Sequence, residues 1–108
     1  MEIHYKDNEI AKICNDEKYA QRKYQRKIAY SLKVLVQKLN LYHSFSDFYT
    51  LNFLRDKYMP EKLKGDKAGI TSLRVDYQYR MELKIEVTKS ENGDDIITIL
   101  EVSNHYGD

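Results

Sequence analysis

The pattern of apolar residues changes its period once along the chain, close to Pro60, the only proline. Before this residue apolar side chains recur every three or four positions, which places them on one face of an α-helix. After it they alternate with polar residues, as in a strand with one buried face. Because helices and strands then occupy separate parts of the sequence, we predict an α+β fold. The length of 108 residues fits a single domain covering 1–108.

The helical half carries one long apolar stripe: Ala20, Tyr24, Ile28, Leu32, Leu35 and Leu39. Asn15 and Asp16 precede the stripe and are residue types that cap a helix N-terminus. We predict a shorter helix before it, over 9–14. A third short helix is predicted over 47–54, with Ser46 as its cap.

The second half predicts strands over 71–77, 79–87 and 96–102. Residues 64–69 have the composition of a polar turn, and Asn92-Gly93 favours a hairpin between the last two strands. Met1 to Tyr5 could add an N-terminal strand. The sequence therefore predicts N-terminal helices packed on a twisted antiparallel sheet of three to four strands.

Several classes of protein are not expected. No apolar run is long enough to cross a bilayer, and the N-terminus lacks the basic start and apolar stretch of a secretory signal. With Cys14 as the only cysteine, we expect a cytoplasmic protein that does not act at a membrane. The sequence has no phosphate-binding glycine motif, and His4, His43 and His105 are scattered, so neither cofactor nor metal is expected. Cys14 itself is predicted to lie in the core.

Charge is distributed unevenly, although the formal net charge is only +1. Every charged residue between Lys18 and Ser46 is basic, including Lys23, Arg26 and Lys27. Such a basic helix could contact nucleic-acid phosphates, bind an acidic partner, or form an ordinary solvated face.

The strand half collects cations and groups that can exchange protons: Lys64, Arg74, Arg80, His105 and Tyr106. Metal-free RNA cleavage requires a group that deprotonates the 2′-hydroxyl, a cation that stabilises the phosphorane, and an acid for the leaving 5′-oxygen. Arginine suits the second role because its planar fork binds phosphate. Histidine, or a tyrosine near cations, suits the others. The same cations could instead solubilise the sheet or pair with glutamates on neighbouring strands.

Three segments in order resemble the HigB branch of the RelE/ParE toxin superfamily. They are Leu63-Lys64-Gly65 with the following Gly69 to Arg74 stretch, then Gln78-Tyr79-Arg80-Met81, then the closing strand that ends in His105-Tyr106. The resemblance implies a RelE-like fold and a toxin that cleaves mRNA on the ribosome. It also implies a HigA-like helix-turn-helix antitoxin, through which alone the toxin would contact operator DNA.

By the same resemblance, Lys64 would bind phosphate, Arg80 would stabilise the transition state, and His105 or Tyr106 would be the acid or base. Together with the charge pattern, it yields a set of expected RNA-binding residues: Lys23, Arg26, Lys27, Lys62, Lys67 and Arg74. The sequence departs from the family pattern at Glu61, where a histidine is common, at Thr71, where an aromatic is usual, and in the order of the closing pair.

Two other functions remain open on the same fold. One is a ParE-like poison of DNA gyrase, which needs no RNA chemistry, and the other is an inactive adaptor that only binds its antitoxin. The departure at Glu61 leaves room for the second. The His105-Tyr106 pair favours the nuclease, because a gyrase binder would not need it.

Overall fold

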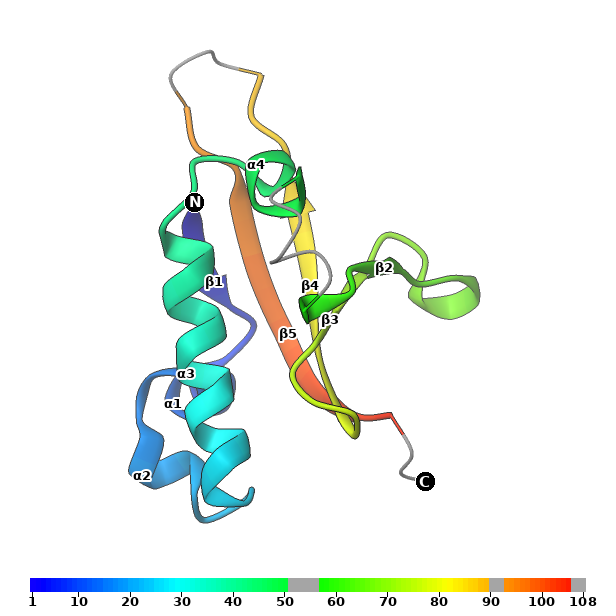
Figure 1. The fold of residues 1–108 in the computed structure, drawn as a ribbon. Coiled ribbons are helices and arrows are strands. Elements are labelled where there is room, and N and C mark those ends of the chain that lie inside the picture. Colours follow the sequence, from blue (N-terminus) through cyan, green and yellow to red (C-terminus); the bar gives the residue numbers. More distant parts are fainter. Residues whose placement is uncertain (51–56, 90–92, 106–108) are drawn as a thin grey trace.

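The computed structural model describes residues 1–50, 57–89 and 93–105, and its helices gather on one side of the sheet (Figure 1). The chain begins with strand β1 (Glu2–Tyr5) and the helices α1 (Asn8–Asn15), α2 (Glu17–Ala20), α3 (Arg26–Asn40) and α4 (Phe45–Thr50). Then come β2 (Glu61–Lys62), the 3₁₀ turn η1 (Gly65–Lys67), β3 (Thr71–Arg74), β4 (Tyr79–Glu86) and β5 (Ile96–Asn104). The predicted α+β architecture is confirmed.

The sheet has five strands in the order β1-β5-β4-β3-β2, and it is mixed rather than antiparallel. Strands β2 to β5 pair antiparallel, whereas β1 lies parallel to β5. The additional parallel pair forms because Glu2 and Lys6 donate backbone hydrogen bonds to the carbonyls of Asp95 and Ile99. Sequence periodicity could not reveal this pairing, since it does not report the direction of a partner strand. It also missed β2, which is too short to show a pattern.

Strand β3 ends at Arg74, three residues before the predicted end. The cause is a tight turn in which Asp76 Oδ1 accepts from the backbone N–H groups of Gln78 (2.8 Å) and Tyr79 (2.7 Å). Aspartate commonly bonds to backbone in this way and so ends regular structure. At the other end of the sheet, β5 continues to Asn104, two residues beyond the prediction.

The long apolar stripe is carried by two helices, not one. Asp16 caps α2, as predicted, by accepting from Tyr19 N–H, but α2 ends at Ala20 and α3 begins only at Arg26. A continuous helix would stack Arg22 on Arg26 and Lys23 on Lys27, and like charges four residues apart destabilise a helix. The break avoids both pairs, while Ala20, Ile28 and the later stripe residues still reach the core.

Helix α4 begins at Phe45, earlier than the predicted 47–54 helix. Ser44, not Ser46, supplies the cap, because its hydroxyl oxygen accepts from Asp47 N–H at 3.1 Å. Residues 51–54 of that prediction lie outside the described residues, as does Asn92 of the predicted hairpin turn. The strands flanking the turn, β4 and β5, do pair antiparallel.

The core lies between the helices and one face of the sheet. Fully buried side chains meet there from both layers: Leu32, Leu35 and Leu39 from α3, and Leu73, Met81, Leu83, Ile97 and Ile99 from the strands. Cys14 is buried among them, as predicted, and this burial raises the pKa of its thiol to about 12. None of the helices in the described ranges is long and apolar enough to cross a membrane.

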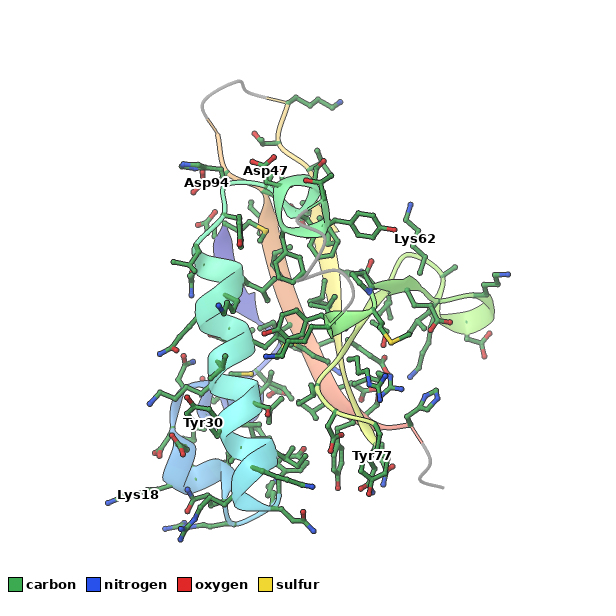
Figure 2. The ribbon with its side chains drawn as sticks, viewed as in Figure 1. Lys18, Tyr30, Asp47, Lys62, Tyr77 and Asp94 are labelled. Carbon is green, nitrogen blue, oxygen red and sulfur yellow. The ribbon has the colours of Figure 1, made fainter. Side chains whose placement is uncertain are left out.

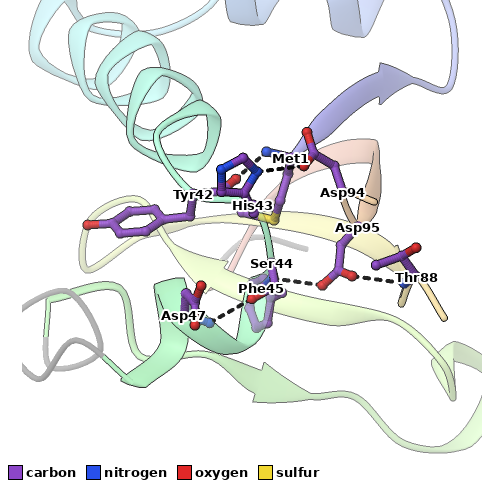
Figure 3. A network of polar contacts seen from close by, with 9 residues as sticks. All are labelled: Met1, Tyr42, His43, Ser44, Phe45, Asp47, Thr88, Asp94 and Asp95. Atoms are coloured by element: carbon purple, nitrogen blue, oxygen red, sulfur yellow. Dashed lines mark hydrogen bonds and ion pairs between the residues drawn. The ribbon is translucent and has the colours of Figure 1, made fainter. Parts of the chain in front are cut away.

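A polar network joins the N-terminus, the α3–α4 connection and the start of β5 (Figure 3). The buried Asp95 carboxylate accepts from the backbone N–H groups of Phe45 and Thr88, each at 2.9 Å. Next to it, Asp94 pairs with His43 at 2.7 Å, and the hydrogen bond from His43 lowers the pKa of Asp94. Asp95 therefore satisfies backbone donors that burial would otherwise leave without partners.

Candidate functional site

The sheet face opposite the helices, called here the open face, carries two adjacent rows of charged residues. In the first row, Arg74 pairs with Arg80 across β3 and β4, and Arg80 pairs with Ser103 on β5. In the second row, the register aligns Glu61, Ser72, Glu82 and Glu101 across β2 to β5. Both rows follow from strand alternation, because Arg80 and Glu82 project away from the helices while Met81 and Leu83 enter the core.

Arg80 is half-buried and is oriented by the turn beside it. Its Nη1 donates to the backbone carbonyls of Asp76 (2.6 Å) and Tyr79 (3.1 Å). A guanidinium has five N–H donors, and within the described part of the chain Nε and Nη2 of Arg80 bond to no other group. The structure therefore holds Arg80 in place and leaves donors for an anion.

Arg74 stands directly opposite Arg80, and like charges at opposed strand positions repel. Its Nη1 contacts the sulfur of Met59 at 3.2 Å, which supplies no compensating charge. An anion bound between the two guanidinium groups would relieve the repulsion and could accept from both. The pair is therefore a candidate phosphate site among the described residues.

The predicted lysines differ in their surroundings. Lys62 projects from β2 into solvent (Figure 2), and Lys64 is exposed at the start of η1. Lys67 instead bonds to both carboxylate oxygens of Glu82, at 3.0 Å each, and lies 3.4 Å from Glu101. The hydrogen bond to Glu82, followed by that to Glu101, raises the pKa of Lys67.

The chain end predicted to supply the acid or base returns to the same part of the sheet. The backbone N–H of His105 donates to the carbonyl of Gln78, which extends the β4–β5 pairing by one step beyond Asn104. His105 is exposed and lies two positions after Ser103, the strand partner of Arg80. Tyr106 lies outside the described residues.

The basic residues of the helical half surround the break between α2 and α3. Lys23 forms an ion pair with Glu9, whose carboxylate also accepts from the Tyr19 hydroxyl. Arg26 and Lys27 are exposed in the first turn of α3, where the helix dipole disfavours cations. This region lies near the sheet, because Tyr24 packs edge-on against Tyr79 with ring centroids 5.2 Å apart.

A groove of about 940 Å³ lies beside α4, where β2 and the start of β3 form the edge of the sheet. Apolar side chains line much of it, among them Phe45, Tyr49, Ile70, Ile85 and Val87. Glu61 and Lys62 of β2 also line this groove, whereas Arg74 and Arg80 do not. Its lining suits apolar groups, whereas the open face suits a phosphate.

The structure adds two carboxylates that the predicted site did not include. Glu61 shares a row with Ser72 and is exposed on the short strand β2. Glu82 is only 4% exposed and lies in the centre of the same row. The alternation of Glu82 with Arg80 and Lys84 was visible in the sequence, but the alignment of Glu61 with Glu82 depends on a register that the sequence does not specify. No group of three histidine, cysteine, aspartate or glutamate side chains in the described ranges could hold a metal.

No protein-family profile and no curated protein sequence matches the chain. Solved structures do match its fold. A YoeB/ParE toxin from Agrobacterium tumefaciens aligns with a TM-score of 0.60 and 19% identity, over 98% of this chain and 100% of the other. A YafQ mutant from E. coli aligns with a TM-score of 0.60 and 18% identity, over 96% and 92%.

A third match is the YoeB–YefM complex from Staphylococcus aureus, with a TM-score of 0.54 and 21% identity, over 98% of each chain. The predicted RelE-like fold is therefore confirmed at the level of architecture. The structures matched are those of YoeB/ParE and YafQ toxins, and the HigB branch in particular is not among them.

Proposed function

We propose that this protein is the toxin of a type II toxin–antitoxin system and that it cleaves mRNA on the ribosome without a metal ion. The observation that carries this proposal is the opposed pair Arg74 and Arg80, held on the open face of a sheet with the fold of YoeB/ParE and YafQ toxins. The narrower assignment to the HigB branch rests on the sequence resemblance alone.

In the proposed reaction the 2′-hydroxyl oxygen of one nucleotide attacks the adjacent phosphorus. The P–O bond to the next 5′-oxygen breaks, which leaves a 2′,3′-cyclic phosphate and a 5′-hydroxyl. Arg80 would stabilise the extra negative charge of the transition state through the N–H donors of Nε and Nη2. Arg74 and Lys64 would bind the same or the adjacent phosphate, and Lys62, Arg26 and Lys27 would contact the RNA backbone further out.

Two proton transfers accompany the attack. One member of the His105-Tyr106 pair would accept the proton of the 2′-hydroxyl, and the other would protonate the leaving 5′-oxygen. The pair would carry both transfers because the sequence has Glu61 where the resembled family often has histidine.

The proposed partner is an antitoxin encoded beside the toxin. The complex of YoeB with YefM supports a protein partner of this kind. Its identity as a HigA-like helix-turn-helix protein, which alone would bind operator DNA, is part of the proposal. So is a cytoplasmic location, where mRNA and ribosomes are available.

A translation mixture with a defined mRNA tests the proposal directly. We expect new RNA ends with 2′,3′-cyclic phosphate. Toxin that has been washed free of metal should form them at the same rate as untreated toxin. A variant with Arg80→Ala, His105→Ala and Tyr106→Ala should fold but leave the mRNA intact. If this triple variant cleaves as fast as the wild type, the assigned residues are wrong.

Expression of the protein in a bacterial strain tests the other two functions. Double-strand breaks in DNA that appear while mRNA stays intact would indicate a gyrase poison. An intact transcriptome and intact DNA, together with binding to the product of the adjacent gene, would indicate an inactive adaptor. Either result would refute the nuclease proposal.

A further inference from the structure

The segment 64–69, called here the lysine loop, joins β2 to β3 and carries both Lys64 and Lys67. It projects from the edge of the sheet (Figure 1). The loop closes at its base, where Leu63 N–H donates to the carbonyl of Ile70 at 2.9 Å. Gly65 and Gly69 both have positive φ, of 66° and 89°, so the path of the backbone requires glycine near each end.

Lys67 connects this loop to two strands that are distant in sequence. Its ammonium has three N–H donors, and it contacts three carboxylate oxygens: Oε1 and Oε2 of Glu82 and Oε1 of Glu101. The two glutamates belong to β4 and β5 and lie directly opposite each other. Without the lysine, their like charges would repel.

We propose that Lys67 is a positioning residue that, together with Glu82 and Glu101, fixes the lysine loop against the open face and thereby sets where Lys64 meets the phosphate. This inference rests on the proposed nuclease function. It assigns Lys67 a role different from the direct RNA contact expected from the sequence.

Burial strengthens this connection. Glu82 is 4% exposed, and a carboxylate removed from water needs a charged or hydrogen-bonding partner. Breaking a pair of this kind costs far more than breaking an exposed one, because a charge is left uncompensated. The raised pKa of Lys67 agrees with a lysine that is held by carboxylates.

The same geometry argues against Lys67 as a phosphate ligand. To bind phosphate, its ammonium would have to leave Glu82 and Glu101. Two glutamates would then face the RNA backbone, and their repulsion would offset the attraction between the lysine and the phosphate. Lys64, which is exposed at the start of the same loop, has no such constraint.

Glu82→Gln distinguishes the two roles of Lys67 in the mRNA cleavage assay. If Lys67 binds phosphate, the substitution frees it and removes a negative charge, so KM should fall and kcat should hold. If Lys67 positions the loop, kcat should drop by about 10- to 100-fold with little change in KM, the effect of misplacing a catalytic group by about 1 Å. Glu86→Gln is the matched control, because Glu86 is exposed on the same strand and face.

A charge exchange supplies the second variant. Lys67→Glu alone should reduce kcat at least as much as Glu82→Gln, and adding Glu82→Lys should restore most of the lost activity. Lys84→Met controls for the loss of a lysine on this face. Glu82→Gln with unchanged kcat, or an exchange that restores nothing, would overturn the positioning role.

Amide hydrogen exchange tests the anchor independently of cleavage. Lys67→Met should speed exchange at Lys67, Ala68 and Ile70, whose N–H groups bond within the loop. Lys84→Met should leave it unchanged. Unaltered exchange in Lys67→Met would refute the anchor even in an active enzyme. Faster exchange in a protein that cleaves no mRNA would refute only the proposed function.

Discussion

The two faces of β4 differ in what their residues contact. Met81 and Leu83 are fully buried against the helices, whereas Arg80 and Glu82, each one position away, face the other side. The first pair belongs to the hydrophobic core, whereas Arg80 donates to backbone carbonyls and Glu82 accepts from Lys67. A single strand thus separates residues that hold the fold together from residues that are available for chemistry. Substitutions on the two faces should therefore have different consequences.

The largest effect on stability is expected on the helix side. Leu83→Ala removes apolar atoms from a fully buried site and should lower the free energy of unfolding by about 2–5 kcal/mol. Lys84→Ala, at the next position on the exposed side, should change it by about 0.5 kcal/mol or less. Urea denaturation of both variants measures the difference, and equal destabilisation would show that the two faces are not separated in this way.

Arg80→Ala should show the reverse pattern. We expect the rate of mRNA cleavage to fall by about 10²- to 10³-fold, the typical cost of removing one transition-state donor. Stability should fall by only about 1–2 kcal/mol, through the loss of hydrogen bonds to Asp76 and Tyr79. Cleavage kinetics and urea denaturation of the same preparation test both parts. A variant that unfolds would place Arg80 with the structural residues instead.

Alkaline titration should break the ion pairs of Lys67 on the open face. Comparison with Lys67→Met separates this effect from the ionisation of Tyr24, Tyr58 and Cys14, whose pKa values are raised by burial. The carboxylate partners raise the pKa of Lys67 above 10.5, so its stabilising contribution is complete below that pH. It is lost as the pH rises through the folded-state value. Wild type should therefore lose more stability than Lys67→Met as the pH rises above about 10.5. Parallel curves for the two proteins would contradict a charged Lys67 bridge.

The smallest expected effect concerns Cys14, which should not react with a thiol reagent in the folded protein. Burial raises the pKa of the Cys14 thiol to about 12, and the thiolate is the reactive form. Iodoacetamide at neutral pH should leave Cys14 unmodified in the folded protein and label it fully in urea. Mass spectrometry detects the adduct, and labelling under native conditions would show that this part of the helix layer opens.

The periodicities in the sequence were sufficient to predict the layers but not the site. Alternation identified which side of β4 would carry Arg80, because side-chain direction in a strand depends on local spacing. It could not predict that Arg74 and Arg80 stand opposite each other, since this depends on where the turn at Asp76 begins. The partners of Lys67 were equally hidden, because Glu82 and Glu101 reach it from strands 15 and 34 residues away in sequence.

The helix boundaries show the same limit. The apolar stripe predicted which residues enter the core, and Ile28, Leu32 and Leu39 are buried there. It did not predict the break between α2 and α3, where hydrophobic periodicity continues although the helix does not. A continuous helix would place Arg22 beside Arg26 and Lys23 beside Lys27, and like-charged pairs of this kind destabilise a helix by about 0.2–0.5 kcal/mol each.

The strand order has a consequence for biosynthesis. Strand β5 follows the other strands in sequence, yet it lies between β1 and β4 in the sheet. A growing chain that has not reached Asn104 therefore lacks the complete strand that joins β1 to β4. Contacts between segments so distant in sequence form slowly. The open face, on which Ser103 of β5 stands opposite Arg80, is therefore complete only after β5 has been made. A chain that stalls before that point carries Arg74 and Arg80 without the strand that completes their surface.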